Sequence, residues 1–199
     1  IDTLFIDAVL VALVVSINKN IKLIPGMFPT LIEFVMDLIH GITLSVAGDR
    51  TKQIFPFFMS FFLFIVISNW SGLMPVLTSI GFFEKEGFVP LFRSPSTDLN
   101  ATIALALVSI VATHSMSIRT LGIKEYLGRF FSFNPFNLFI GLLELISEFT
   151  KIISFSFRLF GNIFVGEVML AQLAAVTAFL LPLPLLFYEI AIGALQAVI

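Results

Sequence analysis

The chain has 199 residues, of which 58% are hydrophobic and only 12% are charged, with a formal net charge of −2 and a mean hydropathy of +1.07. Because a soluble domain typically carries about 25% charged residues, this chain has too few to cover the surface of a compact globule. The composition therefore excludes an ordinary soluble enzyme, a nucleic-acid-binding domain and a disordered chain, and predicts an all-α polytopic membrane protein. The absence of cysteine excludes disulfides, zinc–thiolate sites and iron–sulfur clusters.

Long apolar segments predict about five membrane helices within a single membrane domain, residues 1–199. The first three are residues 1–18, 54–78 and 99–118, and each is close to the roughly 20 residues that cross a bilayer. Residues 28–48, between the first and the second of these segments, follow another pattern. Glu33, Asp37 and His40 fall on one helical face at steps of four and three. This stretch is typical of an amphipathic helix that lies in the membrane interface.

From residue 136 to residue 181 the chain runs for 46 residues without a proline, more than twice the length of one span. Either two helices meet near Gly161 or Gly166, or one long helix is steeply tilted. Neither glycine forces a break, so we expect the single tilted helix. Pro182 and Pro184 then predict a hairpin turn that returns the chain along the flank of the long helix.

The final helix completes the segment 136–199, which we predict to be a long tilted helix plus a last, truncated one. The chain begins without Met and stops within an apolar run, so we expect it to be a fragment of a longer protein. Basic residues set the orientation, because cytoplasmic loops carry an excess of Lys and Arg. With the N-terminus outside, seven of the 11 basic residues lie on the inner side: Lys19, Lys22, Arg50, Lys52, Arg119, Lys124 and Arg129.

A polar stripe follows one face of the long helix. Its members are spaced 4, 3, 7 and 4 residues apart, with two serines beside them: Glu144, Glu148, Lys151, Arg158 and Asn162, and Ser147 and Ser154. A charged side chain at membrane depth costs roughly 2.5–3.5 kcal/mol on insertion scales, so this face must meet protein or water. Lys151 either neutralises Glu148 and Glu144 or has a functional role. Arg158 has no acid three or four residues away, and we predict that it is functional.

Two further acids predict a second polar site. Glu167 lies nine residues after Arg158, about 180° around a straight helix, so the two face different pockets. Glu189 shares a face with Gln196, seven residues on. We expect Glu167 and Glu189 to line an outer cleft and Glu144 to line an inner one, with Arg158 between them. The structural alternative for Glu189 is a buried acid that is hydrogen-bonded to a neighbouring helix.

The segment SFRLFGNIFVGE, residues 156–167, resembles subunit a of F-type ATP synthases, whose signature is an Arg-Leu pair, a small residue, then Asn, with an acid or His nine residues after the Arg. The similarity extends over nearly the whole chain. Four further matches to the family occur in the family's order: SNWSGLMP (68–75), PSTDLNAT (95–102), NPFNL (134–138), and the pair Glu189 and Gln196.

The resemblance implies that Arg158 is the essential arginine that faces the carboxylates of a rotating c-ring. It also implies an outer proton path at Glu167, Glu189, Gln196 and Asp98, and an inner path at Glu144, Ser147, Lys151, Ser154 and Asn162. In many bacterial relatives His stands where this chain has Glu189, so we expect an outer relay that is all-carboxylate at that step. Glu148 matches no family role, and we expect His114 to be structural.

By the same resemblance, the partners are the c-ring, the subunit b peripheral stalk, the rest of the ATP synthase complex, membrane lipids, and protons or sodium ions. No nucleic acid, cofactor or metal is expected. The sequence has no phosphate-binding Gly-rich loop, so we expect no nucleotide site or catalytic centre within this chain. The closeness of the motifs favours a bacterial plasma membrane over an organelle membrane.

Two other classes of membrane protein fit the sequence less well. A small secondary transporter often contains inverted repeats, and the sequence shows no repeat. A purely structural membrane anchor does not explain Arg158 and the acids around it.

Overall fold

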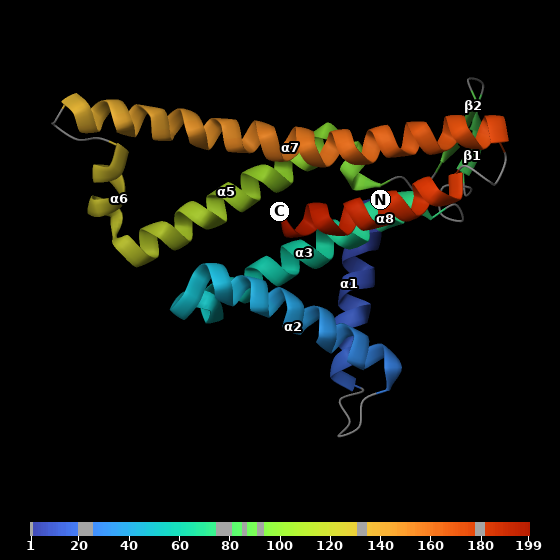
Figure 1. Cartoon of the computed structure of the whole chain (residues 1–199), viewed down its shortest axis with the longest axis horizontal. Coiled ribbons are helices and arrows are strands. Elements are labelled where there is room, and N and C mark those ends of the chain that lie inside the picture. The colour runs from blue at the N-terminus through green and yellow to red at the C-terminus, as the bar shows by residue number, and fades with distance from the viewer. Residues whose placement is uncertain are drawn as a thin grey trace. The chain divides into compact units, whose positions relative to one another are not determined.

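The computed structural model describes residues 2–19, 26–74, 81–84, 87–90, 94–130, 135–177 and 182–199. The described chain is nearly all helical (Figure 1). It forms two compact units, the first made of Ile1–Ser94 and Leu170–Ile199 and the second of Pro95–Met169. Each unit is described by itself below.

The first unit is organised around α3, which spans Thr51–Leu73. Helices α1 (Asp2–Lys19) and α2 (Met27–Ala47) both contact it. Between α2 and α3 the short helix η1 (Gly48–Arg50) changes the chain direction at Gly48, whose φ of 53° favours glycine. The predicted amphipathic segment 28–48 is thus confirmed as a helix, and its three polar residues Glu33, Asp37 and His40 are all exposed.

The last helix, α8 (Pro182–Val198), packs along α3. Two consecutive side chains of α3 donate hydrogen bonds to backbone carbonyls of α8. The Nδ2 of Asn69 lies 3.0 Å from the oxygen of Gly193, and the Nε1 of Trp70 lies 3.1 Å from the oxygen of Ile190. Asn69 is completely buried, and a Cβ added to Gly193 would approach the Cβ of Asn69 to 3.2 Å. Glycine at position 193 therefore permits the close approach of the two helices.

The predicted all-α fold is confirmed for nearly all of the described chain, and one short hairpin departs from it. Strands β1 (Gly81–Glu84) and β2 (Gly87–Pro90) pair antiparallel, with Gly81 opposite Pro90 and Glu84 opposite Gly87. Two short segments that each begin with glycine and contain bulky apolar residues fit a hairpin better than a helix, because glycine disfavours helix interiors and bulky residues favour strands.

The second unit begins with the short helix η2 (Pro95–Thr97) and α5 (Leu99–Leu121). Asp98 caps α5, because its side chain accepts a hydrogen bond of 2.9 Å from the backbone N–H of Asn100. Gly122, with a φ of 83°, ends α5, and the short helix α6 (Ile123–Phe130) follows. In Figure 1, α6 lies between the end of α5 and the start of the long helix α7.

Helix α7 is continuous from Pro135 to Thr177, a length of 43 residues. This confirms a single long helix, unbroken at Gly161 and Gly166, although residues 178–181 lie outside the described part of the chain. The predicted turn at Pro182 and Pro184 is wrong, since both prolines belong to the first turn of α8. Proline is tolerated there because the first backbone N–H groups of a helix have no partner within the helix.

Three described helical segments are long and apolar enough to cross a membrane: Pro29–Leu73, Leu99–Leu121 and Phe136–Thr177. The first includes α2 as well as α3, so the interfacial position of α2 stays a prediction. Helix α8 is a shorter apolar helix. That α1 and α8 cross the membrane stays a prediction, and so does the total of about five membrane helices. Residues 75–78 of the predicted second span lie outside the described part of the chain.

Candidate functional site

Around Arg158, helix α7 has one packed face and one exposed face. Ser156, Leu159 and Ile163 are 1%, 1% and 0% exposed, and their spacing of three and four residues places them on one side of the helix. The hydroxyl of Ser156 donates to the backbone oxygens of Ile152 and Thr102, at 2.8 and 3.4 Å, which ties this side of α7 to α5. Arg158 and Ser154 are exposed.

The Nη2 of Arg158 lies 3.5 Å from the Oγ of Ser154, one turn earlier on α7. Among the described residues, no carboxylate lies within ion-pair distance of it. Since an arginine cannot lose its proton in a protein, this side chain is a permanent positive charge near the middle of a long apolar helix. As the sequence spacing indicated, no acid lies one turn away on α7, and Arg158 forms no ion pair with the acids that the structure describes.

The neighbouring lysine differs from Arg158 in this respect. The Nζ of Lys151 lies 2.8 Å from the Oε1 of Glu148, one turn earlier on α7. Of the two alternatives for this pair, the structure therefore shows the ion pair. Lys151 is 61% exposed, and a pair this exposed is worth about 0–1 kcal/mol of stability. The main consequence of the pair is that the charges of Lys151 and Glu148 neutralise each other.

Glu144 is also neutralised, but by a residue that the stripe does not contain. Its Oε1 lies 2.5 Å from the Nη2 of Arg129, which α6 supplies. Sequence spacing did not suggest this pair, because the two residues are 15 positions apart and lie on different helices. The signal present in the sequence was the short amphipathic segment that carries Arg129, residues 123–130.

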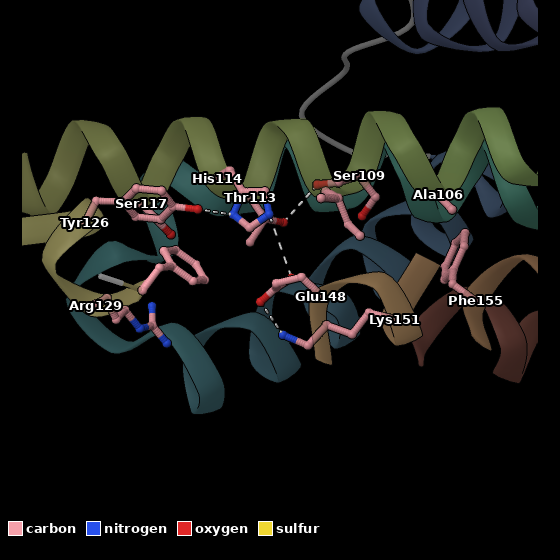
Figure 2. A pocket seen from close by; sticks show the side chains of 12 residues that line it. Ala106, Ser109, Thr113, His114, Ser117, Tyr126, Arg129, Glu148, Lys151 and Phe155 are labelled. Carbon is pink, nitrogen blue, oxygen red and sulfur yellow. Dashed lines mark hydrogen bonds and ion pairs between the residues drawn. The ribbon is translucent and has the colours of Figure 1, made fainter. Parts of the chain in front are cut away.

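Helices α5, α6 and α7 line a cavity of about 320 Å³, to which Glu148 and Lys151 of the stripe contribute (Figure 2). Polar side chains from all three helices line it, and Figure 2 shows contacts that run from Tyr126 to His114, from His114 to Glu148 and from Glu148 to Lys151. The Oη of Tyr126 lies 2.7 Å from the Nδ1 of His114, and the Nε2 of His114 lies 3.8 Å from the Oε2 of Glu148. Burial, and next the negative charge of Glu148, raise the pKa of Tyr126.

The other predicted residues of the inner path are placed as follows. Ser147 is exposed, one turn before Lys151 on α7. Asn162 is half-buried one turn after Arg158, and its Nδ2 has no hydrogen-bond partner among the residues that the structure describes. The structure thus gathers Glu144 and Lys151 near the cavity, together with Glu148 and His114, to which the sequence had given no proton-path role.

The predicted outer residues are divided between the two units. Glu189 on α8 is 4% exposed, and its Oε2 has no hydrogen-bond partner among the described residues. Gln196 lies two turns later on the same helix and is half-buried. Glu167 belongs to the second unit, so the cleft that it was expected to share with Glu189 stays a prediction. Asp98 acts as the cap of α5.

Comparison with protein families gives one match. A family model described as ATP synthase A chain matches residues 3–199. The matched region includes every residue of the stripe, the cavity and α8.

Proposed function

The chain belongs to the ATP synthase A chain family and is an integral membrane subunit of the Fo sector, which contains the c-ring; from this premise we propose that Arg158 is the fixed cation that faces the rotor. One observation carries the proposal. Arg158 is exposed on an apolar helix with no carboxylate partner among the described residues, while acids neutralise the neighbouring Lys151 and Arg129. A charge at membrane depth without an acidic partner among the described residues favours a partner that another chain supplies.

A carboxylate on a neighbouring rotor would supply that partner. At a separation of about 4 Å and an effective dielectric constant near 20, the attraction between the two charges is about 4 kcal/mol. This corresponds to a lowering of the carboxylate pKa by about three units, at ~1.36 kcal/mol per unit. A rotor carboxylate that keeps its proton in lipid therefore releases it beside Arg158.

The same charge prevents direct leakage, because a permanent cation repels a hydrated proton. Each proton must therefore enter by one path, travel with the rotor, and leave by another. The outer path consists of Glu167, Glu189, Gln196 and Asp98, and the inner path of Glu144, Ser147, Lys151, Ser154 and Asn162. The membrane potential contributes about 2.3 kcal/mol per charge for each 100 mV, and this energy drives rotation and ATP synthesis in the soluble part of the complex.

The length of α7 supports a tilted arrangement. At 1.5 Å per residue its 43 residues extend about 65 Å, roughly twice the ~30 Å hydrocarbon thickness of a bilayer. A steeply inclined helix can follow a curved rotor surface while both paths open along it. In this arrangement the chain crosses the membrane about five times, with its N-terminus outside and α2 in the inner interface.

The remaining partners follow from the same assignment. We place the subunit b peripheral stalk and membrane lipids against the surfaces that the rotor does not cover. The transported ion is a proton or a sodium ion, and the membrane is a bacterial plasma membrane. A secondary transporter, the alternative class, would not co-purify with a ring of small two-span subunits, whereas this chain is expected to do so.

The test is ATP-driven proton pumping by the whole synthase in inverted membrane vesicles. Arg158→Ala should abolish pumping while the complex still assembles. Arg119→Ala is the matched control, because Arg119 is an exposed arginine at the end of α5. Pumping that survives in Arg158→Ala, or that is lost equally in Arg119→Ala, contradicts the proposal.

A further inference from the structure

The cavity between α5, α6 and α7 contains a histidine that the proton path above does not use. Both ring nitrogens of His114 face polar partners: Nδ1 lies 2.7 Å from the Oη of Tyr126 and Nε2 lies 3.8 Å from the Oε2 of Glu148 (Figure 2). The side chain of His114 is 29% exposed, and that of Glu148 is 21% exposed. The ring is thus hydrogen-bonded at Nδ1 to a group from α6, and its Nε2 faces a carboxylate from α7.

These partners suit both protonation states of the imidazole. A tyrosine hydroxyl can donate to a neutral nitrogen or accept from an N–H, so Tyr126 keeps its hydrogen bond when His114 gains or loses a proton. Glu148 presents one carboxylate oxygen to Lys151 and the other to His114. The second oxygen stabilises a positive charge on the ring without breaking the pair with Lys151.

The charges around the cavity are balanced before His114 is protonated. The charged and titratable groups that line it are Tyr126 and Arg129 from α6 and Glu148 and Lys151 from α7. Arg129 is paired with Glu144, and Lys151 with Glu148. Both cations are thus already neutralised, which disfavours a phosphate or another anion as the occupant of the cavity.

The cavity lies next to Arg158 along one face of α7. Glu148, Lys151 and Phe155 line the cavity, and Arg158 is the next step of the same helical face. At the other end lies Arg129, one of the basic residues that predict the inner side of the membrane. The hydroxyls of Ser109, Thr113 and Ser117 also line the space, and about 320 Å³ with polar walls is large enough for several water molecules.

Resting on the function proposed above, we propose that His114, with Glu148, is a proton-holding site on the inner side of the path to Arg158. In the step, the Nε2 of His114 takes a proton from a hydronium ion in the cavity. An O–H bond breaks, an N–H bond forms, and the positive charge moves to the ring. Release is the reverse of this step, and no group is oxidised or reduced. Tyr126 is a positioning residue that fixes the ring through Nδ1.

The test measures passive proton conduction through the intact Fo sector in inverted vesicles, from which the soluble head has been removed. A potassium diffusion potential drives the flux, and the pH of the medium, which contacts the inner side, is varied. Histidine ordinarily changes charge between about pH 5 and 8, so the wild type should show a step in conduction within this window. His114→Gln should lose that step. His40→Gln is the matched control, because His40 is the second of the two histidines and contacts Phe55 in the first unit.

A second variant keeps the test decisive if His114→Gln assembles poorly. Glu148→Gln should weaken the step, because it removes the carboxylate that faces the Nε2 of His114. Conduction is expressed per assembled complex, counted by the c-ring that co-purifies with the chain. A wild-type pH profile in both variants overturns the proposal. Arg158→Ala, tested for ATP-driven pumping in the same membranes, reports on the proposed function separately, so failure of one proposal is distinguishable from failure of the other.

Discussion

Replacing Asn69 with alanine should loosen α8 from α3. The substitution removes the hydrogen bond of 3.0 Å to the oxygen of Gly193 and empties a completely buried site. Interhelical hydrogen bonds in membrane proteins average about 0.6 kcal/mol and reach about 1.7. Because Asn69 also loses its packing, we expect a total of about 1–2 kcal/mol, near the range for a buried hydrogen bond.

This energy converts to a measurable melting shift. For a chain of 150–250 residues, each kcal/mol lowers the melting temperature by about 2–4 °C, so the 199-residue chain should melt roughly 2–8 °C lower in detergent. Trp70→Phe removes the bond to the oxygen of Ile190 but should cost less, because Trp70 is 38% exposed. Asn100→Ala, at an exposed asparagine on α5, is the control. An unchanged melting temperature in Asn69→Ala, or an equal fall in Asn100→Ala, would refute the argument.

Two further predictions concern the second unit. Asp98→Ala removes the cap of α5 and should cost about 1 kcal/mol, seen as a lower melting temperature, whereas Asp98→Asn, which keeps a capping oxygen, should cost much less; equal losses in both variants would contradict a capping role. In a Tyr188→Phe background, the one remaining tyrosine, Tyr126, should ionise above its ordinary value of 10.0 when followed by ultraviolet absorbance, because burial and then Glu148 raise its pKa. The folded state binds this proton more tightly than the unfolded state, so the associated stability is present below about pH 10 and is lost as the pH rises. Ionisation at or below the ordinary value would contradict the described environment.

Local rules were sufficient where one helix contains the whole signal. The unbroken run from 136 to 181 predicted α7, and the spacing of Glu33, Asp37 and His40 predicted α2. The three-residue step made the pair of Glu148 with Lys151 one of two alternatives, and the structure shows that pair. Each of these depends only on periodicity within one segment, which the sequence contains directly.

Other features depend on contacts between segments, and the sequence pattern could not supply them. Arg129 reaches Glu144 because α6 turns back toward α7, and Asn69 reaches Gly193 across 124 positions. The proline error had a different cause. Pro182 and Pro184 were interpreted as breaking a helix, although proline is equally compatible with the start of one.

At the candidate site, too, some features follow from spacing within one helix and others depend on contacts between helices. Sequence spacing showed that no acid lies one turn from Arg158 on its own helix, and the structure adds that α5 and α6 supply no ion-pair partner among the described residues. The cavity beside it was not predictable, because its walls come from three helices. His114 was for that reason expected to be structural, and only its contacts with Tyr126 and Glu148 suggest a second role.

The central claim is that the Arg158 face of α7 meets the rotor, and disulfide trapping in the intact synthase tests it most directly. The chain has no cysteine, so each introduced one is the chain's sole reactive thiol. Ser154→Cys lies on the Arg158 face, whereas Ser156→Cys makes the same substitution two residues away on the buried face. With a second cysteine beside the ion-carrying carboxylate of subunit c, Ser154→Cys should form a cross-link to the c-ring and Ser156→Cys should not. A cross-link from Ser156→Cys alone, or from neither variant, would contradict the account.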